Sequence, residues 1–381
     1  MTKTILGNSV HPSPEDLSIV RRPLRGFMGI FVVRLRKIND MLHFDSDYME
    51  GAHPELMRRL METNLEQTSG YGTDEYTERA RQRILETCGL KQGKVFFLVG
   101  GTQTNATVID GLLAHHEGVL AADTGHISVH ESGAIEASGH KVLTLPSYDG
   151  KVRAEDVKGY ITDFYRDDSY EHMVAPGMLY ISHPTELGTL YSLAELEALS
   201  TVCREADIPL YMDGARLGYG LMADGTDVTL EDVARLCDVF YIGGTKVGAL
   251  FGEAVVVTRT DLLPHFFPLV KQHGALLAKG RLLGIQFETL FTDDLYFRIS
   301  RHAIQMAMKL KQAFIAKGHV PYIDSPTNQQ FFRMPNEDID RLMQVASFER
   351  WGPRGDQETL VRFVTNWATR EEAVDELIRH L

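Results

Sequence analysis

Residues 210–252 constrain the fold of this chain more than any other segment. They read LYMDGARLGYGLMADGTDVTLEDVARLCDVFYIGGTKVGALFG. Two short apolar runs, IPLYM and DVFYI, each end in a polar cluster, DGAR in the first case and GGTK in the second. This pattern predicts two buried parallel strands with a helix between them. Such strands deliver the residues that follow them, here Asp213 and Lys246, to one edge of a sheet.

An aspartate and a lysine in these two positions suit one cofactor especially well. Pyridoxal phosphate needs a lysine amine to form a Schiff base with its aldehyde, and a carboxylate to keep its pyridine nitrogen protonated. Either residue alone is more simply a helix cap or a turn lysine. Their order and their separation of 33 residues (246 − 213) favour the cofactor. Arg216, one helical turn from Asp213, can bind a carboxylate in a fork geometry or form a structural salt bridge.

A second informative segment, KVFFLVGGTQTNATVIDGLL, begins at Lys94. It predicts an apolar strand, a turn that contains Gly101 and Thr102, and a helix that begins near Thr104. Helix N-termini offer free N–H donors and the positive end of the helix dipole. The turn is therefore suited to a phosphate group.

Polar residues also follow two other predicted strands. His126 follows a strand end, where an imidazole can stack on a cofactor ring or transfer protons. The next helix is expected to begin near His130, which is the alternative candidate. The strand GMLYIS runs into a turn whose side chains are expected to face the same crevice as the aspartate and the lysine. That turn contains His183, Thr185 and Glu186.

Composition narrows the possible functions. A chain of 381 residues with 44% hydrophobic content can bury the core of a soluble enzyme. A net charge of −13 argues against nucleic-acid binding, which depends on basic residues. Three scattered cysteines fit a reducing cytoplasm and give no support to disulfides or a metal site. No run reaches the roughly 18 apolar residues of a membrane-spanning helix.

Three regions differ in pattern. Residues 1–40 combine many arginines with short apolar pieces in an order that does not match a signal peptide, so we expect an extension outside the fold. Residues 41–280 alternate between strands and helices. They predict a large α/β domain whose mostly parallel sheet is sandwiched by helices. Residues 281–381 predict a smaller α+β domain, to which the first residues after 40 can contribute. Arg362 lies there on a half-buried strand and needs an anionic partner.

From Met41 to Leu381 the sequence resembles the threonine aldolase and β-eliminating lyase family of fold-type-I pyridoxal-phosphate enzymes. The segments that carry the resemblance are FDSDY, GGTQTN, HISVHESG, DGAR, TK and LVRFVTNW. The resemblance implies a role for each matched residue. For the cofactor, Gly101 and Thr102 would bind the phosphate, His126 would stack on the ring, Asp213 would bind the pyridine nitrogen and Lys246 would form the Schiff base. The substrate carboxylate would be bound by Ser46, Arg216 and Arg362. Arg281 would reach a phosphate in the neighbouring subunit.

The chain departs from the family at one site position. The family's glutamate-asparagine-threonine-histidine-asparagine segment reads HPTEL here, which places Glu186 where a histidine near the substrate hydroxyl is expected. A carboxylate can act as the base there if burial raises its pKa.

The resemblance implies a lyase that cleaves the Cα–Cβ bond of a β-hydroxy-α-amino acid such as L-threonine or L-allo-threonine, giving glycine and an aldehyde. Lys246, His126 and Glu186 would be its catalytic residues. The alternatives are β-elimination from another amino acid, and a cofactor-binding relative without turnover. The family also implies a homodimer or homotetramer with shared active sites, a small amino acid as substrate, and a cytoplasmic location without nucleic-acid or membrane partners.

Overall fold

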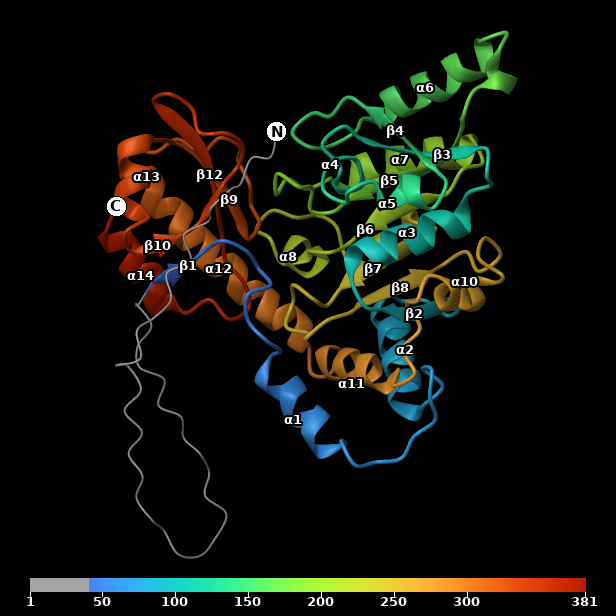
Figure 1. Cartoon of the computed structure of the whole chain (residues 1–381), viewed down its shortest axis with the longest axis horizontal. Helices are drawn as coiled ribbons and strands as arrows, with labels where there is room; N and C mark the ends of the chain where they lie inside the picture. The colour runs from blue at the N-terminus through green and yellow to red at the C-terminus, as the bar shows by residue number, and fades with distance from the viewer. Residues whose placement is uncertain (1–40) are drawn as a thin grey trace, which may run out of the picture. The chain divides into compact units, whose positions relative to one another are not determined.

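The computed structural model describes residues 41–381, and a seven-stranded sheet forms its centre (Figure 1). The expected extension, residues 1–40, lies outside the described residues. β8 runs antiparallel to both of its neighbours, and the other neighbouring strands are parallel. The strands lie in the order β2 (Lys94–Leu98), β8 (Glu253–Val257), β7 (Val239–Gly243), β6 (Leu210–Asp213), β5 (Ala175–Ser182), β3 (Glu117–Ala122) and β4 (Lys141–Leu145).

Helices cover both faces of this sheet. Successive strand residues point to opposite faces, so Val119 joins one apolar cluster and Leu120 the other. The first cluster contains side chains of α3 (Gly101–Leu112), α5 (Ala134–Ala137) and α10 (Phe266–Gln272). The second contains side chains of α1 (Pro54–Glu62), α2 (Glu75–Thr87), α6 (Ala154–Arg166), α7 (Leu193–Glu205), α8 (Leu217–Leu221), α9 (Leu230–Leu236) and α11 (Arg281–Leu290). This arrangement is the predicted sandwich.

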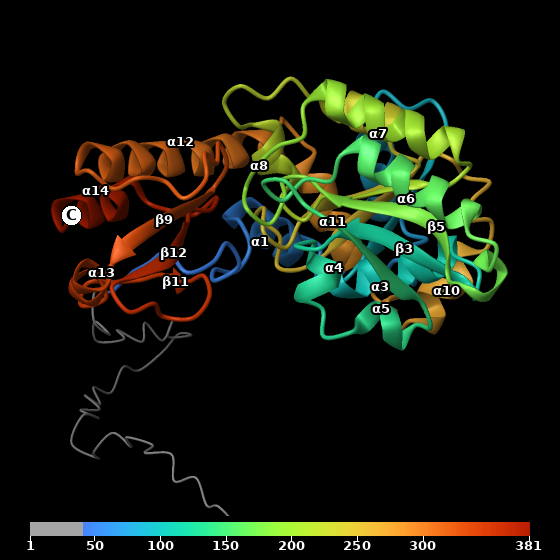
Figure 2. The same cartoon turned by 90° about the horizontal axis from the view of Figure 1, so that it is seen from above.

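A smaller antiparallel sheet with its own apolar core lies in the C-terminal part of the chain. Phe44 packs into that core, because β1 pairs in parallel with β10. Figure 2 shows the long helix α12 running alongside this sheet, with one end near α8, and α12 contacts α8, α14 and β9. The elements are β1 (Leu42–His43), α12 (Leu295–Ala316), β9 (Gln329–Pro335), α13 (Asn336–Leu342), β10 (Ala346–Ser347), β11 (Glu349–Arg350), β12 (Glu358–Val364) and α14 (Glu371–Arg379).

Three local predictions differ from the structure. α3 begins at Gly101 rather than near Thr104. Gly100 precedes the helix in extended conformation and no side chain caps it, so the sequence has no capping residue that marks this start. The single helix expected near His130 is replaced by α4 (His126–Val129) and α5. The left-handed backbone of Gly133, with φ of 75°, separates the two. Finally, both α8 and α9 lie between β6 and β7, where one helix was expected.

Two further features complete the described fold. A short 3₁₀ turn, η2 (Tyr170–His172), precedes β5. Among residues 41–381, no helix is both long and apolar enough to cross a membrane.

Candidate active site

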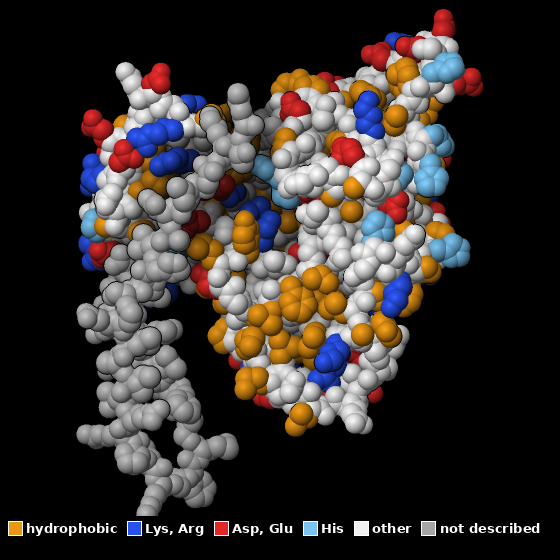
Figure 3. All heavy atoms as spheres, viewed as in Figure 1, with side chains coloured by type: hydrophobic (Ala, Val, Ile, Leu, Met, Phe, Trp, Pro, Cys, Tyr) orange, Lys and Arg blue, Asp and Glu red, His pale blue; other side chains and the backbone are white. Residues whose placement is uncertain are grey.

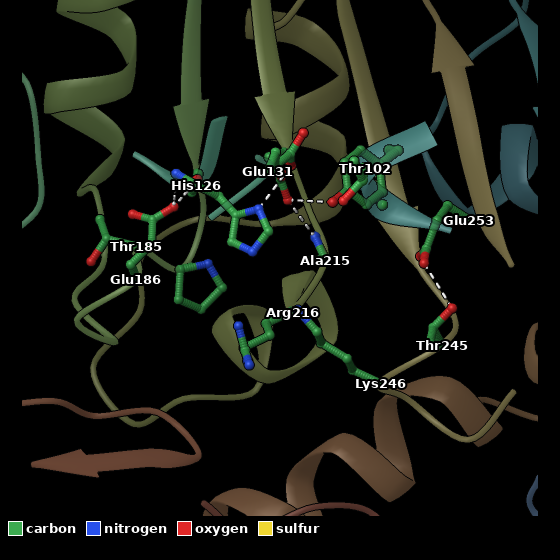
Figure 4. A pocket seen from close by; sticks show the side chains of 15 residues that line it. Thr102, His126, Glu131, Thr185, Glu186, Ala215, Arg216, Thr245, Lys246 and Glu253 are labelled. Atoms are coloured by element: carbon green, nitrogen blue, oxygen red, sulfur yellow. Dashed lines mark hydrogen bonds and ion pairs between the residues drawn. The ribbon is translucent and has the colours of Figure 1, made fainter. Parts of the chain in front are cut away.

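The carboxyl ends of β3, β5, β6 and β7 meet at one edge of the large sheet and build a single pocket (Figure 4). Ligands of open α/β sheets bind at such edges because the loops that follow parallel strands converge there. Eight of the residues singled out from the sequence line this pocket. They are Gly101, Thr102, His126, Thr185, Glu186, Asp213, Arg216 and Lys246.

Asp213, the last residue of β6, is held by four hydrogen bonds. Its Oδ1 accepts from the Tyr241 hydroxyl (2.5 Å) and from the Ala215 backbone N–H (3.0 Å). Its Oδ2 accepts from the Tyr180 hydroxyl (2.7 Å) and from the Asn105 amide (2.9 Å). A carboxylate that accepts several hydrogen bonds is fixed in orientation and favoured in its charged form.

The electrostatic surroundings also keep Asp213 ionised. Burial alone would raise its pKa. The positive charge of His126 and the hydrogen bonds from Tyr241, Asn105 and the Ala215 N–H outweigh burial and lower the pKa. The pocket therefore has an anionic wall at neutral pH.

Lys246 follows β7 by three residues and places its amine in the same pocket. Within residues 41–381 this amine makes no hydrogen bond and no ion pair. Burial, and then the nearby charge of Arg216, lower its pKa, although the carboxylates of Asp47 and Asp213, and Glu253 when it is ionised, oppose the shift. A lysine with a lowered pKa carries more of the neutral, nucleophilic amine.

His126 is oriented by a buried carboxylate that the sequence did not point to. Its Nδ1 lies 2.8 Å from Oε1 of Glu131, whose side chain is fully buried. The same oxygen accepts from the Asn105 amide at 2.7 Å. Because Nδ1 is engaged, Nε2 is the ring nitrogen of His126 that remains for proton exchange in the pocket.

Glu186 lies beside His126 on the turn after β5. Its Oε1 accepts from the Ser182 hydroxyl (2.6 Å) and from the backbone N–H of His126 (2.9 Å). Burial raises the pKa of Glu186, the Ser182 hydrogen bond opposes this, and the charge of Asp213 adds to it. A carboxylate at this position can act as a base if burial raises its pKa, and burial raises the pKa of Glu186.

Arg216 forms a buried fork with Asp47. Its Nε donates to Oδ2 of Asp47 at 2.7 Å and its Nη2 donates to Oδ1 at 3.0 Å. The Asn328 amide also donates to Oδ2 of Asp47. Burial would raise the pKa of Asp47, but the charges of Arg216 and Lys246 and these hydrogen bonds lower it. Asp47 thus fixes the guanidinium of Arg216 in the pocket and leaves Nη1 for a ligand.

Replacing Asp47 by alanine is expected to lower the free energy of unfolding by about 3–5 kcal/mol, because it leaves the buried charge of Arg216 without a partner. Urea unfolding of the purified protein measures this loss. Asp45→Ala is the matched control. Asp45 is a partly exposed neighbour that contacts His43 and Ser347, and its loss is expected to cost less than about 1 kcal/mol. Equal losses for the two variants would contradict the role given to Asp47.

The other sequence-predicted residues do not line this pocket in the single chain. Ser46 is half-buried and immediately precedes Asp47. Arg281, the first residue of α11, donates to the backbone carbonyls of Glu66 (2.7 Å) and Thr63 (2.5 Å).

Arg362 and His183 are buried and are not part of the pocket lining. Arg362 donates to Gln329 Oε1 (2.7 Å), contacts Glu349, and lies 4.5 Å from the ring centroid of Trp351. Burial and the charge of Arg216 lower its pKa, so the two guanidinium groups lie within electrostatic range. Burial lowers the pKa of His183 to about 4, which keeps this histidine neutral. His130 lies beside the pocket, with its ring centroid 5.6 Å from that of His126.

Four further groups of the site were missed by sequence analysis. Tyr241, Glu131 and Glu253 line the pocket, and Tyr180 donates a hydrogen bond to Asp213. The two tyrosines look like ordinary core residues within apolar strands. Glu131 lies in a loop that contains several polar residues. Glu253 could have been found from the sequence, because it is an acidic residue at the start of the otherwise apolar strand EAVVV, and buried acidic residues are unusual.

Comparisons with known proteins agree with this site. The sequence model described as Beta-eliminating lyase matches residues 43–330. A low specificity L-threonine aldolase of Pseudomonas sp. is 30% identical over 346 residues, which cover 88% of this chain and 95% of the relative. The solved structure of Leishmania major threonine aldolase is 41% identical, has a TM-score of 0.86, and is matched over 89% of this chain and 98% of that one.

A more distant structure, the aspartate aminotransferase of Thermus thermophilus, shares the fold, with a TM-score of 0.66 at 15% identity over 90% of this chain and 91% of that one. The predicted fold class is therefore confirmed as α/β of fold type I. The predicted resemblance to the threonine aldolase and β-eliminating lyase family is also confirmed. The chain belongs to the threonine aldolase and β-eliminating lyase family.

Proposed function

We propose that this protein binds pyridoxal 5′-phosphate in the pocket between Asp213 and Lys246. There it cleaves the Cα–Cβ bond of a β-hydroxy-α-amino acid of the L-threonine or L-allo-threonine type, and the products are glycine and an aldehyde. The observation that carries this proposal is the pairing of an anionic aspartate with a lysine of lowered pKa in one pocket. The relatives named as threonine aldolases support the choice of reaction.

The residues present fit the proposed cofactor. Lys246 offers an amine without a competing partner among the described residues, and Asp213 offers a fixed negative charge to hold a proton on the pyridine nitrogen. The twelve-residue helix α3 starts at Gly101 and Thr102, where free backbone N–H groups suit a phosphate. When bound, the cofactor supplies an aldehyde for attachment to an amine and a protonated ring that accepts the electrons of a breaking bond.

The substrate carboxylate is proposed to bind at Arg216. Its Nε and Nη2 are occupied by Asp47, so the guanidinium cannot rotate freely and presents Nη1 to a ligand. A fixed guanidinium orients a carboxylate at lower entropic cost than a free one. We propose Ser46 and Arg362 as further contacts of this carboxylate.

Proton transfer is proposed to rely on Glu186 and His126. Glu186, with its raised pKa, accepts the proton of the β-hydroxyl group. The electron pair of the O–H bond then forms the carbonyl of the aldehyde while the Cα–Cβ bond breaks. His126, held through Nδ1 by Glu131, keeps Nε2 available at the same face of the pocket.

Glu186→Gln is expected to lower kcat by roughly 10²- to 10⁴-fold, because it removes the general base. In the wild type, kcat/KM should fall as the pH drops through the raised pKa of Glu186, since the base must be ionised. Ser182→Ala is the matched variant. This variant removes a hydrogen bond that lowers the pKa of Glu186. The fall of kcat/KM at acid pH should therefore begin at a higher pH, while most activity remains. A pH profile unchanged in Ser182→Ala would contradict the assignment of this fall to Glu186.

The reaction itself is tested by incubating the holoenzyme with L-threonine, L-allo-threonine and L-serine in turn. Glycine and acetaldehyde from the first two substrates, in more than tenfold excess over bound cofactor, support the proposal. Pyruvate and ammonia instead would assign the chain to the eliminating enzymes of the family. Bound cofactor without any product would leave a binding protein.

A homodimer or homotetramer is proposed from the exposed apolar side chains of the large domain. Figure 3 shows hydrophobic side chains gathered over the region where α1, α2 and α11 lie in Figure 1. Met61, Leu65, Tyr71 and Phe267 are exposed, and large exposed apolar groups of this kind mark interfaces. Arg281 contacts the backbone next to this surface and is proposed to reach the phosphate of the partner subunit. Sedimentation that shows an active monomer would contradict this arrangement.

A further inference from the structure

Glu253 lines the same pocket, and no step described above uses it. It opens β8 and is only 3% exposed. Its Cα lies opposite that of Leu98, the last residue of β2, and opposite that of Gly243, the last residue of β7. The chain continues from Leu98 into the turn that starts α3, and from Gly243 into the turn that carries Lys246. Glu253 therefore lies between the turn suited to phosphate and the turn that holds the lysine.

The carboxyl group of Glu253 is fixed by the turn that follows β7. Its Oε1 accepts from the Thr245 hydroxyl at 2.7 Å, and its Oε2 accepts from the backbone N–H of Gly244 at 3.0 Å. Figure 4 shows Thr102, Glu253 and Thr245 on one side of the pocket and Glu186 on the other. The group thus belongs to the phosphate side of the site rather than to the side that carries the proposed base.

The charges and hydrogen bonds around Glu253 do not cancel the rise in its pKa that burial causes. Burial raises the pKa of Glu253 to about 8. The Thr245 hydrogen bond, the charge of Lys246 and the Gly244 N–H lower it, and the negative charge of Asp213 raises it. The remaining titratable neighbours are buried phenols that stay uncharged near neutral pH: Tyr211, Tyr241 and Tyr296. The carboxyl group is consequently neutral in most molecules at pH 7.

A phosphate ester is a dianion at this pH, because its second pKa is about 6. An ionised carboxylate beside it would repel it, whereas a protonated carboxyl can donate a hydrogen bond to it. We propose that Glu253 is a proton-carrying member of the phosphate site, and that its carboxyl O–H donates to the phosphate of the bound cofactor. This inference rests on the proposed cofactor. Where Glu253 is ionised in the free protein, phosphate binding must take up one proton from solution.

This linkage gives phosphate affinity a defined pH dependence. Below about pH 8 the carboxyl group is already protonated and affinity is insensitive to its titration. Above that pH the free protein loses the proton, and affinity falls by up to tenfold for each pH unit. The dissociation constant should therefore be about tenfold larger at pH 9 than at pH 7 from this group alone.

The test compares wild type with Glu253→Gln, using pyridoxine 5′-phosphate as the ligand. This ligand has an alcohol in place of the aldehyde, so it does not react with Lys246. Its own groups titrate identically in both experiments, and the ratio of the two dissociation constants isolates Glu253. We expect the affinity of wild type to fall about tenfold relative to Glu253→Gln between pH 7 and pH 9. Calorimetry in two buffers should also show about one more proton taken up by wild type at pH 9.

Two further variants keep the test decisive. Glu186→Gln removes a buried carboxyl on the opposite side of the pocket and should keep the wild-type pH dependence. Thr245→Val removes a hydrogen bond that lowers the pKa of Glu253, and it should move the onset of weakening to higher pH even if Glu253→Gln does not fold. A ratio that stays constant from pH 7 to pH 9 overturns the role of Glu253 and leaves the cofactor proposal intact. Failure of every protein to bind the ligand at any pH overturns both.

Discussion

Lys246→Ala is expected to abolish covalent attachment of pyridoxal 5′-phosphate and to lower the rate of substrate cleavage by roughly 10⁴- to 10⁶-fold. Its amine lines the pocket, has a lowered pKa, and makes no ion pair within residues 41–381. Removing it takes away both the point of attachment and the group that releases the product. The visible absorbance of the attached cofactor measures the first effect, and single-turnover kinetics with L-threonine measure the second.

A surface lysine gives the control for this variant. Lys309 forms ion pairs with Glu371 and Asp375 between α12 and α14, far along the chain from the pocket residues. Lys309→Ala should therefore keep both the absorbance and the rate. If Lys246→Ala still carried the cofactor covalently after borohydride reduction and gel filtration in denaturant, another amine would hold the cofactor, and the assignment of Lys246 would be wrong.

The features that sequence predicted well are those set by local pattern. Buried strands that end in polar clusters place their next residues at one sheet edge, and this rule brought Asp213, Lys246, His126 and Glu186 into one pocket. The strand pattern also predicted the sandwich of helices, because apolar runs that alternate with amphipathic helices leave few other ways to bury a sheet.

The features that sequence missed depend on contacts between distant segments. Asp47 meets Arg216 across 169 positions, and Asn105 meets Asp213 across 108. No local rule pairs such residues, because their approach is set by the packing of whole elements. Arg362 shows the same limit. Its strand was predicted, but its partners Gln329 and Glu349 come from β9 and β11, and this pairing is a property of the folded sheet.

Asp213→Asn is expected to lower kcat by roughly 10³-fold, because a neutral amide does not hold a proton on the pyridine nitrogen. It should also destabilise the apoprotein. Each carboxylate oxygen accepts from two donors, so the new NH₂ group must face either Tyr241 and the Ala215 N–H or Tyr180 and Asn105. Leaving these buried donors without an acceptor costs about 1–3 kcal/mol for each one.

A second buried aspartate separates the catalytic effect from the structural one. Asp238 is also buried, and its carboxylate accepts from the Leu210 backbone N–H outside the pocket. Asp238→Asn should lower the free energy of unfolding while kcat per bound cofactor stays near the wild-type value. Thermal unfolding and active-site-titrated kinetics on both variants give the comparison. If Asp213→Asn lost stability but kept kcat per bound cofactor, its four hydrogen bonds would serve only the fold, and the ring nitrogen would need another partner.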